Sequence, residues 1–282
     1  MSELQTPRLA MRDGRQLPQL GFGVFLVAPD ETTQAVSSAL AAGYRHIDSA
    51  AGYRNEAEVG EAIRVSGVDR GDVFVTTKLF NSDHGYQEAK RACQLSHDRL
   101  GLGPIDLYLI HWPVPSQDRY VETWKALIDL QREGLVRSIG VSNFQPAHLE
   151  RLVAETGVTP VVNQIELHPR MQQPALRELH EQLGILTEAW SPLGRGAVLD
   201  DPVITEIAER RQRTPAQVVI RWELELGIVV LTKTVQPARM RENLDVLDFE
   251  LTPEDRTAIE ALDIAERIGP DPDTFVAPPQ TS

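Results

Sequence analysis

Residues 73–110 hold two apolar runs with a helical segment between them, namely Val73–Lys78 (VFVTTK), Glu88–Leu100 (EAKRACQLSHDRL) and Ile105–Ile110 (IDLYLI). Short runs rich in β-branched residues are typical of strands, whereas the longer segment reads as a helix that ends at Gly101. A strand followed by a helix and a second strand predicts parallel strands joined by a right-handed crossover. The segment therefore predicts an α/β fold.

The same alternation runs along the chain and gives eight strand candidates. They are Leu20–Gly23, Tyr44–Asp48, Val73–Lys78, Ile105–Ile110, Val136–Val141, Val161–Ile165, Ile185–Ala189 and Ile228–Leu231. Eight units of roughly 35 residues each predict a closed (β/α)8 TIM barrel, forming a single domain over residues 1–282. The rival is a doubly wound sheet, which would normally carry G-x-G-x-x-G if it bound a dinucleotide. Both Gly21-Phe22-Gly23 and Gly101-Leu102-Gly103 lack the third glycine.

Local signals mark the ends of the elements. Leu9–Met11 and Gln16–Leu20 flank Asp13-Gly14, which predicts an N-terminal β-hairpin that plugs the bottom of the barrel. Thr214-Pro215-Ala216-Gln217 and Thr252-Pro253-Glu254-Asp255 predict helix starts with a threonine cap and proline in the first turn. After Asp263 the Pro-rich chain has no period, so we expect a C-terminal extended tail over the surface.

Composition excludes several classes of function. The net charge of −13 argues against nucleic acid or an anionic membrane as partner. One cysteine, Cys93, excludes an intramolecular disulfide and is expected to be a buried, inert thiol. The N-terminus lacks the apolar core of a signal peptide, and the apolar runs are too short to span a bilayer. We therefore expect a cytoplasmic protein. The seven histidines show neither H-E-x-x-H nor paired Cys/His spacing, so no metal site is expected.

Polar residues stand where the apolar strands end, which is where a barrel enzyme has its active site. The strand ends are Asp48, Lys78, His111, Asn143, Gln164, Trp190 and Lys233, and Tyr53 lies in the loop after Asp48. Carbonyl reduction needs a proton donor, and free tyrosine, with a pKa of about 10, is a sluggish one. A nearby lysine ammonium is expected to lower that pKa, an aspartate to hold the lysine, and a histidine to orient the carbonyl.

Each of these residues also has an ordinary structural explanation. Asp48 suits a helix cap, Lys78 a solvated strand end, Tyr53 a cover for the edge of the core, and His111 a satisfied core histidine. Taken singly, each explanation is the better one. Four such residues at one rim of a barrel favour the catalytic interpretation.

Several motifs of this sequence resemble those of a known family. Residues 46–60 (HIDSAAGYRNEAEVG) resemble the first signature of the aldo-keto reductase superfamily. Residues 74–79 (FVTTKL) resemble its catalytic lysine strand and residues 106–113 (DLYLIHWP) its histidine strand, with 139–144 (IGVSNF) and 163–166 (NQIE) in family order. The likeness extends from about Leu9 to Leu262 and is nearest to the prokaryotic branch that includes 2,5-diketogluconate reductases. It implies a catalytic tetrad of Asp48, Tyr53, Lys78 and His111, with Tyr53 as general acid, and a monomer.

A cationic stretch follows the last strand. Residues 226–241 contain no acid but carry Lys233, Arg239 and Arg241, in the place where barrels commonly bind phosphate. Lys233 and Arg239 are expected to clamp a 2′-phosphate, which predicts NADPH as the cofactor, although a solvated helix end explains the same charges. Residues 231–243 (LTKTVQPARMREN) resemble the third family signature, except that Thr232 replaces its proline and Thr234 its serine. Loss of the proline is expected to loosen this loop.

By the same resemblance, Ser142, Asn143 and Gln164 hold the carboxamide of the nicotinamide and Trp190 stacks on its ring, although core packing explains this tryptophan equally well. The residues assigned to the cofactor are Gly23, Val24, Ser142, Asn143, Gln164, Trp190, Ser191, Leu193, Lys233, Thr234, Val235, Arg239, Glu242 and Asn243.

Phe25, Phe80 and Trp112 follow strands one, three and four and are expected to wall the substrate pocket, with core packing as the alternative. The function predicted is NADPH-dependent reduction of small dicarbonyls, aldehydes or keto-sugar acids. Two other functions stay open: a redox-sensing module that binds NADPH and regulates a partner, and a barrel isomerase or lyase without a nicotinamide. The latter leaves the cationic stretch without a role.

Overall fold

Eight parallel strands close into a barrel in the computed structural model, which describes residues 6–276. They follow one another around the barrel in chain order, and β10 pairs with β3 to close it. The strands are β3 (Leu20–Gly23), β4 (His46–Asp48), β5 (Phe74–Leu79), β6 (Ile105–Ile110), β7 (Val136–Ser142), β8 (Val162–Glu166), β9 (Leu186–Trp190) and β10 (Val229–Thr232). The predicted (β/α)8 barrel and its eight strands are confirmed.

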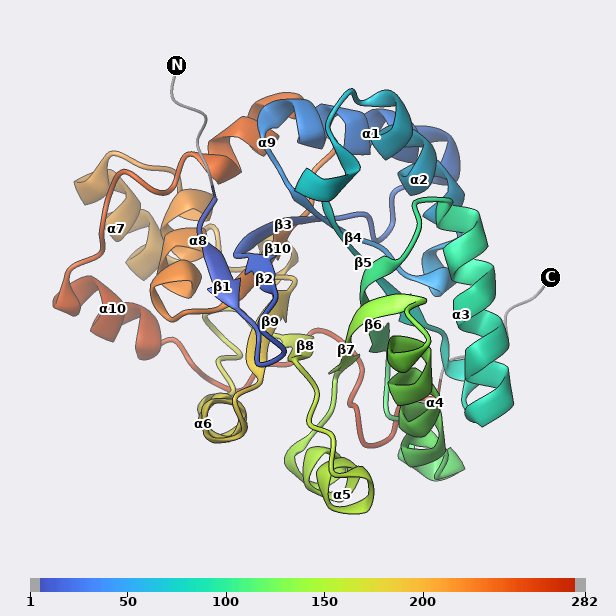
Figure 1. The fold of residues 1–282 in the computed structure, drawn as a ribbon. Coiled ribbons are helices and arrows are strands. Elements are labelled where there is room, and N and C mark those ends of the chain that lie inside the picture. Colours follow the sequence, from blue (N-terminus) through green and yellow to red (C-terminus); the bar gives the residue numbers. More distant parts are fainter. Residues whose placement is uncertain (1–5, 277–282) are drawn as a thin grey trace.

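Helices surround the barrel, as Figure 1 shows. They are α1 (Pro29–Ala42), α2 (Glu56–Val65), α3 (Tyr86–Leu100), α4 (Tyr120–Arg132), α5 (Pro146–Thr156), α6 (Pro174–Leu183), α7 (Pro202–Arg211), α8 (Pro215–Glu225), α9 (Pro237–Leu244) and α10 (Pro253–Glu260). Short 3₁₀ turns are η1 (Ala51–Tyr53), η2 (Arg70–Asp72), η3 (Asn81–Asp83), η4 (Pro115–Gln117) and η5 (Gly194–Gly196). None of the helices within residues 6–276 is long and apolar enough to cross a membrane.

Proline begins many of these helices because the first helical N–H has no partner within the helix and the fixed φ of proline suits that position. The two predicted threonine caps are present. Thr214 accepts from the N–H of Gln217 at 3.3 Å, and Thr252 accepts from the N–H of Asp255 at 3.3 Å. Both form capping boxes, which fix where α8 and α10 start.

The predicted hairpin is also present and closes one end of the barrel (Figure 1). Strands β1 (Arg8–Ala10) and β2 (Gln16–Pro18) pair antiparallel across the turn at Gly14. Leu17 and Met11 are buried against Leu107 and Leu109, whose strand β6 lies in the barrel wall. The hairpin therefore extends the apolar core at the N-terminal ends of the strands, and the opposite end is left for the site.

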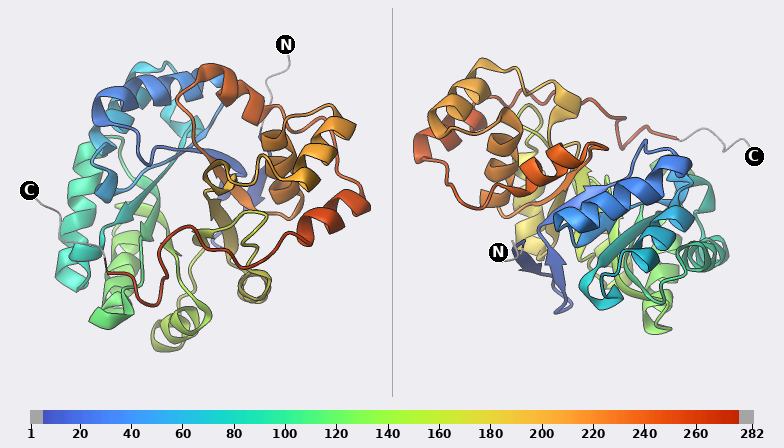
Figure 2. Two further views of the ribbon diagram at one scale, coloured as in Figure 1. Left: turned by 180° about the vertical axis from the view of Figure 1, so that it is seen from behind. Right: turned by 90° about the horizontal axis from the view of Figure 1, so that it is seen from above.

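The tail crosses that opposite end, on the far side from the hairpin (Figure 2). Residues 264–276 form neither helix nor strand, and two backbone N–H groups hold them down. Ile268 N and Gly269 N donate to the buried Glu166 carboxylate at 2.6 and 2.9 Å. A Cβ at Gly269 would lie 2.4 Å from the Trp190 ring, so only glycine fits here. The extended path is confirmed for these residues, and the rest of the predicted tail, 277–282, lies outside the described residues.

Candidate active site

Asp48 and Lys78 form an ion pair beneath the carboxyl end of the barrel. Asp48 ends β4 and Lys78 lies on the neighbouring β5, so both side chains point into the barrel. The Lys78 ammonium donates to Asp48 Oδ1 at 2.6 Å and to the carbonyl of Ser49 at 2.9 Å. Burial by itself disfavours the ammonium, but attraction to Asp48 raises the pKa of Lys78 overall. Lys78 is therefore a fixed cation at neutral pH.

Tyr53 and His111 lie above this ion pair. The Lys78 ammonium is 5.1 Å from the centre of the Tyr53 ring, and the rings of Tyr53 and His111 meet edge to face with centroids 5.7 Å apart. The sequence suggested that Lys78 lowers the pKa of Tyr53. It does so, but burial acts more strongly in the other direction, and the pKa of Tyr53 is raised overall. The phenol thus keeps its proton at neutral pH, which a general acid requires.

His111 is neutral in these surroundings. Burial, and then the charge of Lys78, hold the pKa of its imidazole well below the usual range. Its Nδ1 has no hydrogen-bond partner among the described residues, and its backbone carbonyl accepts from Asn143 Nδ2 at 3.0 Å. A neutral imidazole donates a single hydrogen bond, so His111 is suited to orienting an oxygen and not to carrying charge.

A cavity of about 790 Å³ opens over the site. Lys78 does not line it, because its side chain is fully buried behind Asp48 and Tyr53. Most of the residues singled out from the sequence meet at its wall. They are Gly23, Phe25, Asp48, Tyr53, Phe80, His111, Trp112, Ser142, Asn143, Gln164, Trp190, Ser191, Leu193, Lys233 and Arg239.

Hydrogen bonds hold the polar side of this wall in place. Asn143, with a left-handed φ of 64°, accepts from Trp190 Nε1 at 2.8 Å. The hydroxyl of Ser142 donates to the carbonyl of Gln164 at 2.8 Å, and Gln164 Nε2 donates to Asp48 Oδ2 at 2.9 Å. The amide-bearing wall and the tetrad are therefore one hydrogen-bonded unit.

The other end of the cavity is cationic. Lys233 and Arg239 line it, and neither forms an ion pair within residues 6–276. In a chain of net charge −13, two cations without a carboxylate partner on one cavity wall suit an anionic group. The residues present therefore fit a dinucleotide with a phosphate at this end.

Five assigned residues lie outside the cavity wall. Val24 is fully buried, and Val235 is half exposed. Thr234 accepts from the N–H of Gln236 at 3.2 Å, and Glu242 accepts from the hydroxyl of Thr214 at 2.8 Å. The remaining one, Asn243, is buried. The assignment of these five to the cofactor stays a prediction.

The expectation that Thr232 loosens the cofactor loop stays a prediction, but the threonine itself is bonded into the barrel. Thr232 is the last residue of β10 and pairs in register with Phe22 of β3. Its hydroxyl and that of Tyr44 lie 2.8 Å apart, and both side chains are buried. The threonine therefore ties the start of the loop to the sheet, a bond that proline cannot make.

Comparison with known proteins places this chain in a family. The family model described as the aldo/keto reductase family matches residues 19–264. An aldo-keto reductase of Mycolicibacterium smegmatis is 55% identical, covering 96% of this chain and 98% of the relative. Methylglyoxal reductase DkgA of Escherichia coli is 51% identical, covering 95% and 97% of the two chains. This chain belongs to the aldo/keto reductase family.

A solved structure agrees with this assignment. The apo crystal structure of Gox0644 superposes with a TM-score of 0.93 at 50% identity, covering 96% of this chain and 99% of that one. A mutant of Gox0644 has been crystallised in complex with NADPH. The family expected from the sequence motifs is confirmed.

Two parts of the pocket of this aldo/keto reductase were missed in the sequence. Phe275 packs on Trp112 with ring centroids 4.6 Å apart, and Pro270 and Phe275 line the cavity. Arg195, in η5, also lines it and adds a third cation. Phe275 is the one aromatic residue after Asp263, and that was the available signal. Nothing in the local pattern around Arg195 distinguishes it from a surface arginine.

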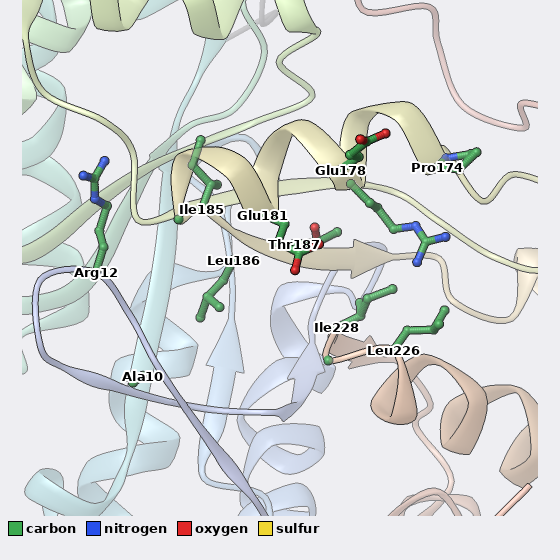
Figure 3. A pocket seen from close by; sticks show the side chains of 13 residues that line it. Ala10, Arg12, Pro174, Glu178, Glu181, Ile185, Leu186, Thr187, Leu226 and Ile228 are labelled. Atoms are coloured by element: carbon green, nitrogen blue, oxygen red, sulfur yellow. The ribbon is translucent and has the colours of Figure 1, made fainter.

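A second cavity, of about 700 Å³, opens at the hairpin end of the barrel. Its wall comes from the hairpin, from α6 and from the segments leading into β9 and β10, as Figure 3 shows. Arg12, Glu178 and Glu181 are among its charged residues, and no member of the tetrad reaches it. Within residues 6–276 no cluster of three metal-ligating side chains is present. The residues singled out from the sequence thus meet at the first cavity and not at this one.

Proposed function

We propose that this chain reduces the carbonyl group of small aldehydes and ketones to the alcohol, using NADPH, with Tyr53 as proton donor. The observation that carries the proposal is the placement of Tyr53 beside His111 on the cavity wall, with the Lys78–Asp48 ion pair directly behind. A neutral phenol, a neutral imidazole and a fixed ammonium are the groups that protonation of a carbonyl oxygen requires.

NADPH supplies a hydride to the carbonyl carbon when it is bound. Asn143 and Gln164 would hold its carboxamide, with Ser142 and Gly23 beside them, and Trp190 offers a flat face for the nicotinamide ring. Ser191 and Leu193 would lie along the pyrophosphate. Lys233 and Arg239 would hold the 2′-phosphate. The NADPH complex of the related Gox0644 supports this choice of cofactor.

The proton that the carbonyl oxygen receives comes from a single group of this chain, the Tyr53 hydroxyl. The Tyr53 hydroxyl donates its proton to the carbonyl oxygen while that oxygen gains negative charge, which leaves a phenolate. Lys78 stabilises the phenolate because its ammonium is held close by Asp48 and Ser49. His111 donates a hydrogen bond that orients the carbonyl. Solvent returns the proton to Tyr53 after the alcohol leaves.

The aromatic walls favour small carbonyl compounds. Phe25, Phe80 and Trp112 line the end of the cavity where the carbonyl would react. The ring centroids of Phe25 and Tyr53 are 5.1 Å apart. The name of the Escherichia coli relative, methylglyoxal reductase, supports small dicarbonyls as substrates, beside simple aldehydes and keto-sugar acids. A cytoplasmic location and a monomeric state stay predictions.

The direct test is NADPH consumption by the purified protein with methylglyoxal, propionaldehyde, benzaldehyde and 2,5-diketogluconate. Turnover with at least one of them is expected, and NADPH is expected to outperform NADH. NADPH binding, followed by quenching of tryptophan fluorescence, is measured in the same samples. Tight NADPH binding without turnover of any of the four would overturn the proposal and favour the redox-sensing function.

A further inference from the structure

Glu188 is a buried carboxyl group that the reduction described above does not use. It lies in the middle of β9, points into the barrel below the cavity and has no solvent exposure. Gln164 of β8 contacts it, and His46 of β4 lies 3.7 Å from its Oε1. That Oε1 makes no hydrogen bond within the described residues. Because burying a carboxyl group is costly, its position beside the tetrad suggests a role in the chemistry.

The link between Glu188 and the tetrad is the amide of Gln164. Its Nε2 donates to Glu188 Oε2 at 2.7 Å and to Asp48 Oδ2 at 2.9 Å. An amide nitrogen has two hydrogens, so both are used by carboxyl groups, and only Oε1 is left for a molecule in the cavity. The flipped amide would set its oxygen against the Asp48 carboxylate, which has no hydrogen to donate. Glu188 and Asp48 together therefore fix the orientation of Gln164.

Charge below the cavity is nearly balanced without Glu188. Asp48 and Lys78 neutralise each other at 2.6 Å. Burial, and then the charge of Lys78, lower the pKa of His46 to about 3, so this histidine is neutral. Burial, and then the charge of Asp48, raise the pKa of Glu188 to about 8. At neutral pH the site therefore holds one ion pair and a neutral carboxylic acid.

We propose that Glu188 is a positioning residue of the reduction: as a neutral acid it holds the Gln164 amide against Asp48, and its ionisation at alkaline pH makes Tyr53 a weaker proton donor. The inference rests on the proposed function. It adds a titrating group that none of the sequence motifs indicated.

The neighbours of Glu188 explain how its ionisation affects proton donation by Tyr53. When its proton leaves, a second negative charge joins Asp48 around the single cation Lys78. The charge of Glu188 raises the pKa of both Tyr53 and Lys78, so the phenol holds its proton more firmly. His46 stays neutral throughout this range, and Val229, which pairs with Glu188 from β10, brings no charge. Alkaline pH therefore slows proton donation.

The test compares wild type with Glu188→Gln, which keeps the volume and the acceptor oxygen and cannot ionise. The quantity measured is kcat/KM for methylglyoxal at saturating NADPH between about pH 6 and pH 10. We expect the wild-type value to fall above about pH 8, by up to about tenfold per pH unit, towards the lower value of the ionised form. The fall in the variant should begin at least about one pH unit higher than in wild type. Glu223→Gln is the matched control, because Glu223 is also fully buried but lies on α8, outside the barrel wall.

Unfolding of the ligand-free protein gives a second readout. A raised pKa in the folded state means that folding loses free energy as pH rises from the ordinary glutamate value of 4.5 to about 8. The stability of wild type relative to Glu188→Gln should therefore decline over this interval. Glu188→Leu, which removes the acceptor, should lower kcat/KM at every pH and weaken NADPH binding.

The outcomes separate the two proposals. An inactive wild type contradicts the proposed function and leaves the unfolding experiment to decide the ionisation of Glu188. An active wild type whose kcat/KM is level to about pH 9, or a variant with the same alkaline fall as wild type, overturns the role of Glu188 while the reduction stands. A shift of the alkaline fall in Glu223→Gln equal to that in Glu188→Gln also overturns it.

Discussion

Burial and neighbouring charge set the protonation of each tetrad residue, and they act in opposite directions. Lys78 stays charged because Asp48 outweighs the cost of burying the ammonium. His111 is neutral because burial and Lys78 both disfavour its cation. Tyr53 keeps its proton because burial outweighs Lys78. In the proposed mechanism these protonation states supply one proton donor, one orienting group and one fixed charge.

The preference for NADPH over NADH is expected to depend on two side chains, Lys233 and Arg239. Arg239→Ala or Lys233→Ala should raise the Kd of NADPH about 10- to 100-fold, because each removes a charge-assisted hydrogen bond to a phosphate. The Kd of NADH should change much less, since NADH lacks the 2′-phosphate. Fluorescence titrations with both cofactors measure the difference. Equal losses for the two would contradict the assignment.

The control for this prediction is Arg241→Ala. Arg241 belongs to the same cationic stretch but does not line the cavity. Its replacement should leave the Kd of NADPH within about twofold.

At the scale of elements, the start of α10 depends on one carboxylate. Asp255 accepts from Arg210 at 2.8 Å, from Arg211 and from the N–H of Thr252. Burial opposes its ionisation, but the two arginines and Thr252 lower the pKa of Asp255 to about 2. Because the folded pKa lies below its ordinary value of 3.8, Asp255 stabilises the fold above that pH, and the contribution is lost as pH falls towards 2.

Asp255→Asn should therefore lower the free energy of unfolding by about 1–3 kcal/mol near neutral pH. The difference from wild type should shrink between about pH 4 and pH 2. Urea unfolding at several pH values measures it. Asp248→Asn, which removes an exposed carboxylate paired with Arg213, should cost less than about 1 kcal/mol. A pH-independent loss in Asp255→Asn would show that the ionised carboxylate is not the cause.

Much of this element structure could be predicted because its signals are local. Proline, threonine caps and terminal glycines lie within a few residues of the ends that they mark. The start of β4 differs from the prediction by two residues. Tyr44 N still donates to Ala39 O at 3.0 Å and so completes the end of α1 before the strand begins at His46. Hydrogen bonds of this kind depend on helix geometry, so residue types alone do not show where the strand begins.

Contacts between distant segments could not be predicted in this way. Phe275 reaches Trp112 through a tail without period, held by Glu166, about a hundred residues earlier. Glu188 looks like an ordinary polar residue in a short strand. Pairing of β9 with β8 sets it beside Gln164, and only closure of the barrel brings Gln164 to Asp48 of β4. The net pKa of Tyr53 likewise depends on how fully the site is buried, which the motif does not show.

At the scale of the whole molecule, the two ends of the barrel are closed in different ways. The hairpin packs apolar side chains such as Leu17 into one end. The tail crosses the other end and contributes Pro270 and Phe275 to the cavity wall. The candidate active site therefore lies at the end that the tail covers, opposite the hairpin.

Phe275→Ala should raise KM for the carbonyl substrate about three- to tenfold, because the aromatic contact with Trp112 shapes that wall. The Kd of NADPH should not change. Steady-state kinetics and fluorescence titration measure the two constants. Val276→Ala, at the half-exposed neighbouring position, is the control and should match wild type. An equal rise in the Kd of NADPH would place Phe275 at the cofactor instead.

The central claim is that Tyr53 gives the proton, and Tyr53→Phe tests it most directly. The variant keeps the ring against His111 and Phe25 and loses only the hydroxyl. The account predicts that kcat/KM for methylglyoxal falls about 100- to 10,000-fold while the Kd of NADPH stays within about twofold, since only the transition state uses that hydroxyl. Turnover in Tyr53→Phe within about tenfold of wild type would contradict the account, because the proton would then come from another group.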